Sequence, residues 1–442
     1  MIMASPIPNR WLIAVMGVLL QLCLGTVYAW SYFQKPLVET YHWGNSPVAW
    51  VFSLAILFLS LAAALGGALL PKFGPRRLAM LGGTCFGLGY LLAALALRIQ
   101  SLPLLYLGYG IIGGTGLGLG YVTPVATVAK WFPDKKGLVT GMVVMGFGFG
   151  ALLMSKVLAP ALMHLADKNL VIVFGALGVI FLVITLPVAS LMRNPPANYI
   201  PPGYKPATFD AGKESIAAHN VTAAQAIVSW KFTLMWLVFF CNIVAGIMFI
   251  GFQSPMLQDI LKAGNAGLTV AQLAASGATL IAVSSIFNGA GRFFWGGLSD
   301  KLHRAATFRI LLGTQIIAFE LLLLMGNTIS PWMFGLLVCY VLLCYGGGFG
   351  TMPAFVLDVF GQQLMPRVYG ALLTAWGCAG IVGPQLVALI KDHATQQASF
   401  YSFSAGAGFL ALGFIAALAL NDSRLKSATR SRMPNDRDQI SS

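Results

Sequence analysis

Apolar runs of about 20 residues each recur along the whole of this 442-residue chain. A run of that length crosses the ~30 Å hydrocarbon core of a bilayer as one helix, because a helix pairs its own backbone polar groups. The pattern therefore predicts an all-α membrane protein with twelve transmembrane helices. The runs lie near residues 11–33, 47–70, 78–98, 103–128, 137–160, 169–192, 232–256, 270–297, 306–326, 331–357, 368–390 and 398–420.

The composition also indicates a protein embedded in lipid. Hydrophobic residues make up 58% of the chain and charged residues only 9%, which is too little polar surface for a soluble globule. The net charge of +14 falls in short breaks between the apolar runs and not on one basic face. We therefore expect a lipid bilayer as the surroundings and no nucleic acid as a partner.

The distribution of basic residues predicts the orientation. With the N-terminus assigned to the cytoplasm, twenty Lys and Arg residues fall on that side and five on the other. Because basic residues concentrate in cytoplasmic loops, this bias predicts that both termini are cytoplasmic. The short loops and the lack of a further domain favour a multi-pass protein of a prokaryotic inner membrane.

A polar stretch rich in proline divides the apolar runs into two sets of six. We expect an N-terminal six-helix half over residues 1–192 and a C-terminal six-helix half over residues 232–420. Residues 193–231 would form a cytoplasmic linker with a short surface helix near its end. Residues 421–442 would form a cytoplasmic tail.

The two halves share an internal repeat. Three glycines and a proline of the first half recur in the second half at a constant separation of 229 residues. The pairs are Gly67 with Gly296, Pro124 with Pro353, Gly141 with Gly370, and Gly148 with Gly377. Such a repeat predicts two parallel six-helix pseudo-repeats, with a substrate site between them near the bilayer midplane.

Arg292 is an isolated cation within the eighth apolar run. The nearest charge that follows it, Asp300, lies eight residues on, about 12 Å along a helix. An intramembrane cation is expensive and is usually retained for an anion, a cavity or a partner. Asn288 lies one turn earlier on the same helix face. The pair predicts a site for a substrate carboxylate, with a structural ion pair as the alternative.

Motifs for other chemistry are missing from the sequence. All six cysteines lie within apolar runs, and no spacing of Cys or His suits a metal. The G-x-G-x-x-G of residues 108–113 lacks the preceding strand that a dinucleotide site needs, so close helix packing explains it better. No phosphate-binding loop or nucleophile elbow is present. We therefore predict no catalytic residues, no metal and no cofactor, and a protein that is not an enzyme.

The loop after the eighth run carries a resemblance to the major facilitator superfamily. Its sequence GGLSDKLHR, which begins at Gly296, is similar to the family's G-x-x-x-D-x-x-G-R loop, with His303 at the second glycine. The resemblance implies a gating loop formed by Gly296, Asp300 and Arg304. The corresponding GALLPKFGPRR of the first half has Pro71 where the acidic residue would stand.

Within that superfamily, the sequence GLGYVTPVATVAKWFPDKKGLVTG of residues 118–141 is similar to the fourth-span signature of the oxalate/formate antiporter family, a branch close to the monocarboxylate transporters. The resemblance covers all twelve predicted spans. It implies that Arg292 binds the substrate carboxylate, with Asn288 beside it. The further pocket residues that it implies are Tyr121, Tyr345 and Phe349.

The substrate expectation rests on the number of cations. Oxalate-handling relatives carry a lysine in span eleven, whereas residues 368–390 contain no Lys or Arg. One arginine neutralises one carboxylate, so a monocarboxylate such as lactate or pyruvate suits the chain better than a dianion. We also expect Tyr28 of the first run to reach the cavity, because its hydroxyl needs a partner if it is buried; packing or an interfacial position is the alternative.

Three functions remain open at this stage. The preferred one is a secondary transporter of small monocarboxylates that works by alternating access with proton symport. The second is an anion antiporter that exchanges one carboxylate for another. The third is a carboxylate sensor that binds without transport.

Overall fold

The computed structural model describes most of the chain and shows α-helices joined by short loops. The described residues are 9–196, 199–201, 222–265, 267–361, 363–394 and 397–423. Most of the predicted linker and of the predicted tail, residues 202–221 and 424–442, therefore lies outside the described residues. Near the end of the linker, the short helix α10 (Ala223–Ile227) confirms the expected surface helix.

The first half contains eleven helical elements, three of which depart from α-helical geometry. They are α1 (Arg10–Leu24), the 3₁₀ turn η1 (Gly25–Ala29), α2 (Trp30–Tyr41), α3 (Asn45–Arg98), α4 (Leu102–Leu105), the π-helix η2 (Tyr106–Gly113), α5 (Gly114–Trp131), α6 (Lys136–Leu153), the π-helix η3 (Met154–Leu158), α7 (Ala159–Leu165) and α8 (Leu170–Ser190).

The second half has longer unbroken helices. They are α11 (Trp230–Gly264), α12 (Val270–Leu302), α13 (Arg304–Met325), the 3₁₀ turn η4 (Gly326–Thr328), α14 (Pro331–Phe360), α15 (Met365–Leu372), α16 (Thr374–His393) and α17 (Ala398–Leu418). Polar side chains start several of them, as in the capping box that Thr269 and Gln272 form at the start of α12.

The number of membrane crossings follows from one break in α3. In the described part of the chain, eleven helical segments are long and apolar enough to cross a membrane. One of them, α3, has 54 residues, which is about 80 Å of helix and far more than the ~30 Å core requires. Gly74 interrupts it with φ 75° and ψ 162°, a conformation open to glycine. The break divides α3 into two spans and confirms the predicted twelve.

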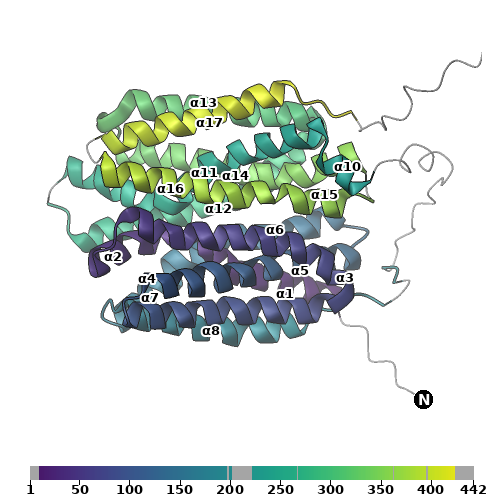
Figure 1. The fold of residues 1–442 in the computed structure, drawn as a ribbon, viewed down its shortest axis with the longest axis horizontal. Coiled ribbons are helices and arrows are strands. Elements are labelled where there is room, and N and C mark those ends of the chain that lie inside the picture. Colours follow the sequence, from purple (N-terminus) through teal and green to yellow (C-terminus); the bar gives the residue numbers. More distant parts are fainter. Residues whose placement is uncertain are drawn as a thin grey trace, which may run out of the picture.

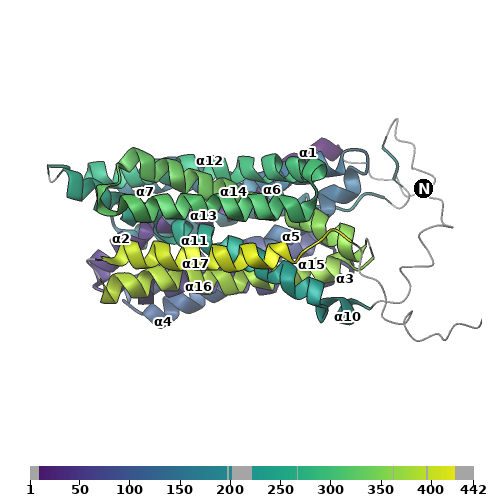
Figure 2. The same cartoon turned by 90° about the horizontal axis from the view of Figure 1, so that it is seen from above.

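The helices form a bundle of two halves that lie side by side. Figure 1 shows α1 to α8 on one side and α11 to α17 on the other, and Figure 2 shows them running along the same axis. The halves meet where α3 packs on α16, α6 on α12 and α2 on α11. We call the end of the bundle where α1 begins and α17 ends the terminal face, and the other end the opposite face.

Gly148 and Gly377, one glycine pair of the repeat, occupy equivalent places in this interface. Gly148 of α6 packs on Gly289 of α12, where an added Cβ would lie 2.8 Å from the Cα of Gly289. Its repeat partner Gly377, on α16, packs on Ser60 of α3. Each glycine therefore lets a helix of one half approach a helix of the other closely. This pseudo-symmetry is the one that the 229-residue separation predicts.

The turn between α12 and α13 has nearly the same backbone conformation as the break in α3, but a histidine stands there in place of glycine. His303 lies 229 residues after Gly74 and has φ 67° and ψ 151°. That region is essentially reserved for glycine, and a side chain there stores on the order of 1 to 3 kcal/mol of strain. The exposed His303 ring offsets little of this strain energy, because the nearest acidic group, the Asp422 carboxylate, is 3.9 Å away.

We expect His303→Gly to stabilise the protein by about 1 kcal/mol, because relief of backbone strain exceeds the greater unfolded-state entropy of glycine. The measurement is the melting temperature in detergent, which should rise. His393→Gly is the control, since His393 ends the regular helix α16 and glycine should leave stability unchanged or lower it. A lower melting temperature for His303→Gly would show that the turn is unstrained.

Candidate functional site

Arg292 lies on α12 at the interface of the two halves and is only 5% exposed. The atoms Nε, Nη1 and Nη2 all lack a hydrogen-bond partner among the described residues. The guanidinium carbon lies 5.2 Å from the ring centre of Phe349 on α14, which is a cation–π contact. An aromatic face compensates only a small part of the cost of burying a cation. The site therefore offers a full set of free donors to an anion.

Six aromatic side chains form a connected cluster beside Arg292. Tyr28, Tyr345, Phe349, Trp376 and Phe147 make a closed circuit in which neighbouring ring centres lie 4.8 to 6.2 Å apart. The sixth, Tyr121, has its ring edge against two of them, at 5.2 and 5.5 Å. Three rings come from the first half and three from the second. The aromatic cluster therefore spans the interface between the two halves.

Tyr28 and Tyr345 join the two halves directly. Their hydroxyl oxygens lie 2.7 Å apart in a hydrogen bond, although the residues are 317 positions apart in sequence. Arg292 lies close to both hydroxyls. Gly246 of α11 makes room for the Tyr345 ring, because a Cβ at that glycine would lie 2.4 Å from a ring carbon.

A break in the first span positions Tyr28. The α-helix of α1 gives way to the 3₁₀ turn η1 at Gly25, and Tyr28 lies within that turn. Gly25 and Gly150 of α6 are in direct backbone contact, since a Cβ on Gly150 would lie 2.2 Å from the carbonyl carbon of Gly25. The sequence predicted a first span over residues 11–33, which the structure contains, but the apolar pattern gave no sign of this turn. The close backbone contact with α6 holds the chain in the tighter geometry.

Asn288 and Tyr121 flank the site. Asn288 is 1% exposed, and its side chain makes no hydrogen bond among the described residues, with Oδ1 fully buried. The backbone carbonyl of Tyr121 accepts a hydrogen bond of 3.0 Å from Nε2 of Gln21, which ties α5 to α1. The structure therefore gathers Arg292, Tyr28 and Tyr345 closely, with Asn288 one turn away from Arg292.

Two residues at the site have no counterpart in the sequence predictions. Phe147 links the rings of Tyr28 and Tyr121, and Tyr369 of α15 lies near Arg292. Phe147 lies in the glycine-rich GFGFG of α6, where no charge or motif points to it. Tyr369 lies near the terminal-face end of its span, where a tyrosine is usually an interfacial anchor.

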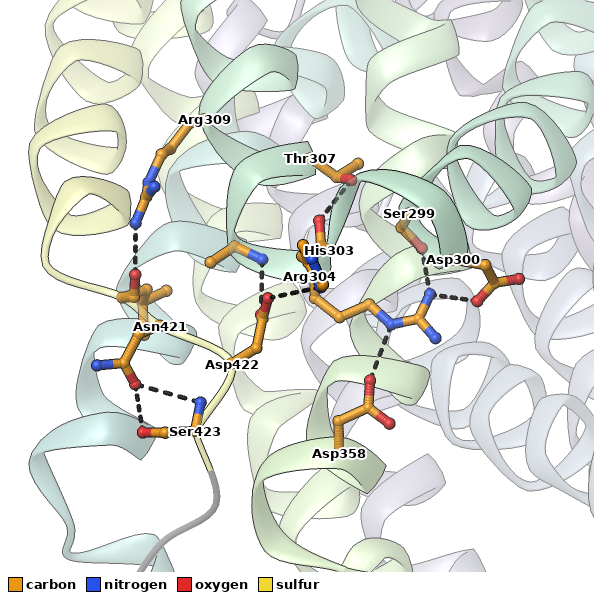
Figure 3. Close-up of polar contacts among 12 residues, drawn as sticks. Ser299, Asp300, His303, Arg304, Thr307, Arg309, Asp358, Asn421, Asp422 and Ser423 are labelled. Atoms are coloured by element: carbon orange, nitrogen blue, oxygen red, sulfur yellow. Dashed lines mark hydrogen bonds and ion pairs between the residues drawn. The ribbon is translucent and has the colours of Figure 1, made fainter.

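The predicted gating loop forms an ion-pair network within the second half. Nη1 of Arg304 lies 2.6 Å from the Asp300 carboxylate, and Nε donates to Asp358 at 3.0 Å. Nη1 also donates to the hydroxyl of Ser299. Figure 3 shows Arg304 between these partners. Gly296 packs against the backbone of α14. Asp358 was missed because no motif spacing links it to the loop.

Polar contacts close the interface at both sides of the site. At the opposite face, Asp392 of α16 accepts hydrogen bonds from the backbone N–H groups of Asn45 and Ser46 at 3.1 and 2.9 Å, and so caps the start of α3. Nearer the terminal face, the Ser60 hydroxyl of α3 donates to the carbonyl of Leu373 at 3.0 Å. The structure is therefore closed around Arg292.

Comparisons with known proteins agree with this architecture. The family model described as Major Facilitator Superfamily matches residues 10–384. The oxalate:formate antiporter of Oxalobacter formigenes is 26% identical, over 87% of this chain and 86% of its own. The apicoplast pyruvate carrier 1 of Toxoplasma gondii is 28% identical, over 80% of this chain and 78% of its own. Mammalian monocarboxylate transporters are further relatives.

A solved structure supports the fold alone. The bacterial homologue of the human lysosomal transporter Spinster, in an inward-facing and occupied conformation, superposes with a TM-score of 0.64 at 15% identity, covering 94% of this chain and 97% of that one. The twelve spans, the repeat and the loop at Gly296 are consistent with the family model that matches most of the chain. The chain therefore belongs to the major facilitator superfamily of multi-pass membrane transporters, which are not enzymes.

Proposed function

We propose that this protein is a secondary transporter of small monocarboxylates of the lactate and pyruvate type. The observation that carries the proposal is Arg292, a buried cation with every donor free, enclosed by both halves. A carboxylate would accept two parallel hydrogen bonds from the guanidinium and cancel its charge. Alternating access then follows if the two halves rock about this site.

The surroundings of Arg292 favour one carboxylate and a short carbon chain. Among the described residues, no second Lys or Arg contacts the aromatic cluster. A dianion such as oxalate would keep one uncompensated charge in this enclosed space. Phe349 and Trp376 supply an apolar wall for a small carbon skeleton, and Tyr121 and Tyr345 supply hydroxyl donors.

Proton symport is the coupling that fits an electroneutral cycle. Arg292 and the carboxylate form a neutral pair when the site is loaded, so the cycle carries no net charge only if one proton, delivered through water, crosses with each carboxylate. In the described part of the chain, no carboxylate or histidine contacts the cluster, so no side chain is assigned as the proton carrier. Glu320, the acidic residue of span nine, lies on the exposed side of α13.

Exchange of anions is the second candidate, and the similarity to an oxalate:formate antiporter favours it.

Under either mechanism the protein would lie in a cell inner membrane with both termini in the cytoplasm, since the basic residues concentrate at the terminal face. The ion pairs of Asp300 and Arg304 would then act on the cytoplasmic side as part of the gate.

The test is uptake of radiolabelled L-lactate, pyruvate, formate and oxalate into proteoliposomes. Symport predicts that a monocarboxylate accumulates when the outside is more acidic than the inside, without a transport current. Uptake that occurs only with a carboxylate trapped inside would identify an exchanger. A current, or uptake that is independent of the pH gradient, would contradict electroneutral symport.

A further inference from the structure

The start of α3, at the opposite face, has two backbone donors that its own residues do not satisfy. The first N–H groups of a helix have no partner within it, and Gly44, the residue before α3, has no side chain to cap them. Pro47 carries no N–H group, and the N–H of Val48 bonds to the carbonyl of Gly44 at 3.3 Å. The free donors of the first turn are therefore those of Asn45 and Ser46.

Asp392 of α16, in the other half, bonds to both donors. Its Oδ1 accepts from the backbone N–H of Asn45 at 3.1 Å and from the side-chain amide at 2.9 Å. Its Oδ2 accepts from the N–H of Ser46 at 2.9 Å. The carboxylate also lies at the positive end of the α3 dipole. Two turns earlier on α16, Gln385 accepts a hydrogen bond of 2.8 Å from the Ser46 hydroxyl.

Each side of this contact is held within its own half. Lys391, next to Asp392, forms an ion pair of 2.6 Å with Asp259 of α11, which holds the end of α16. The carbonyl of Pro47 accepts a hydrogen bond of 2.8 Å from the hydroxyl of Tyr106 in η2, which holds the start of α3. The two halves therefore cannot separate at this point without breaking the bonds to Asp392.

The contact closes one end of the interface that contains Arg292. Alternating access requires this interface to open to one face at a time. Opening at the opposite face would remove the cap of α3 and leave its two donors to water. Loss of a typical helix cap changes an equilibrium about 5-fold. The bonds to Asp392 therefore favour the state that is closed at the opposite face.

We propose that Asp392 is the latch of the opposite face, which caps α3 across the interface in the closed state and releases it when the halves open there. Gln385 is the second contact of the same latch. The inference rests on the alternating access of the proposed function, and it does not depend on which acid is carried.

The experiment measures opening with a reporter cysteine behind the latch. Ser284 of α12 is 0% exposed and lines a small cavity between the halves together with Tyr28. A cysteine there, Ser284→Cys, should react with a cationic, membrane-impermeant methanethiosulfonate only when the interface opens. The rate is measured without substrate, in intact cells and in inverted membrane vesicles. The protein without Ser284→Cys is the blank for the native cysteines.

Asp392→Ala should raise the reaction rate about 5-fold in intact cells and not in inverted vesicles. Asp392→Asn, which keeps one acceptor oxygen, should give a smaller rise. For a transported acid supplied from outside, the KM of Asp392→Ala should fall by up to about 5-fold, because a larger fraction of the protein is open to that side. Glu39→Ala is the control, since Glu39 is an acidic residue of α2 whose ion pair, with Lys35, lies within the first half.

The outcomes separate the latch from the proposed function. An unchanged rate in Asp392→Ala, an equal rise in both preparations, a rise confined to inverted vesicles, or an equal rise in Glu39→Ala would each refute the latch. The expected rise in a protein that transports no carboxylate would support the latch and refute the proposed function. Should Asp392→Ala fail to fold, the milder Asp392→Asn carries the test.

Discussion

Arg292→Met should abolish carboxylate uptake and yet raise the stability of the empty protein. Removing a charged hydrogen-bonding partner from a buried site costs about 2 to 5 kcal/mol of binding, so uptake should fall by at least about 30-fold. The same change removes a buried cation that makes no hydrogen bond to any described residue, which should stabilise the fold by about 1 to 4 kcal/mol. The measurements are initial uptake rates and melting temperatures in detergent without substrate.

The variant Arg292→Lys separates the effect of the guanidinium's shape on uptake from the effect of its charge. Arg292→Lys keeps the cation but loses the planar fork, so uptake should fall less than in Arg292→Met while the melting temperature changes little. Saturating substrate should raise the melting temperature of the parent, since a ligand at 100 times its Kd adds about 2.7 kcal/mol. It should have no effect on Arg292→Met.

A second cation within a span provides the control. Lys156 lies in η3 and is exposed, with a hydrogen bond of 2.6 Å to the hydroxyl of Thr279. Lys156→Met should change uptake only a few-fold, because it removes no buried charge. Undiminished uptake in Arg292→Met, or a fall as large in Lys156→Met, would place the carboxylate elsewhere.

A methyl group added to either glycine at the contact of η1 with α6 should destabilise the protein. A Cβ on Gly25 would lie 2.0 Å from the carbonyl oxygen of Phe147, and one on Gly150 would lie 2.2 Å from the backbone of Gly25. Neither neighbour is a flexible side-chain end, so the helices must separate. We expect Gly25→Ala and Gly150→Ala each to destabilise the protein by at least about 3 kcal/mol. Uptake should fall as well, since η1 carries Tyr28.

Gly408→Ala is the matched control for these substitutions. Gly408 lies inside α17, and a Cβ added there would have no heavy atom within 4 Å, so alanine should stabilise the helix by up to about 1 kcal/mol. Thermal unfolding in detergent and the yield of monodisperse protein report the difference. Normal stability of Gly150→Ala would show that α1 and α6 are not in backbone contact.

Much of the architecture is encoded locally, and the sequence therefore predicted it. Apolar runs long enough to cross a bilayer can only be helices there, which defines the spans. Glycines that permit close packing must recur in both halves, so Gly148 and Gly377 revealed the repeat. Arg292 was recognisable for the same reason, since an isolated cation within a span is rarely retained without an anion, a cavity or a partner.

The tertiary structure alone decided which side chains meet. The hydroxyl contact between Tyr28 and Tyr345 joins positions 317 residues apart and depends on the rotation of each helix about its axis. The packing of the helices likewise decided that Phe147 lies in the aromatic cluster and that Ser284 hydrogen-bonds to Gln253. The sequence by itself determined the helices, the two halves and the buried cation, because these follow from hydrophobicity and charge. The break at Gly25 and the composition of the site required the packing of α1 on α6, because contacts between distant helices leave no periodic pattern in either one.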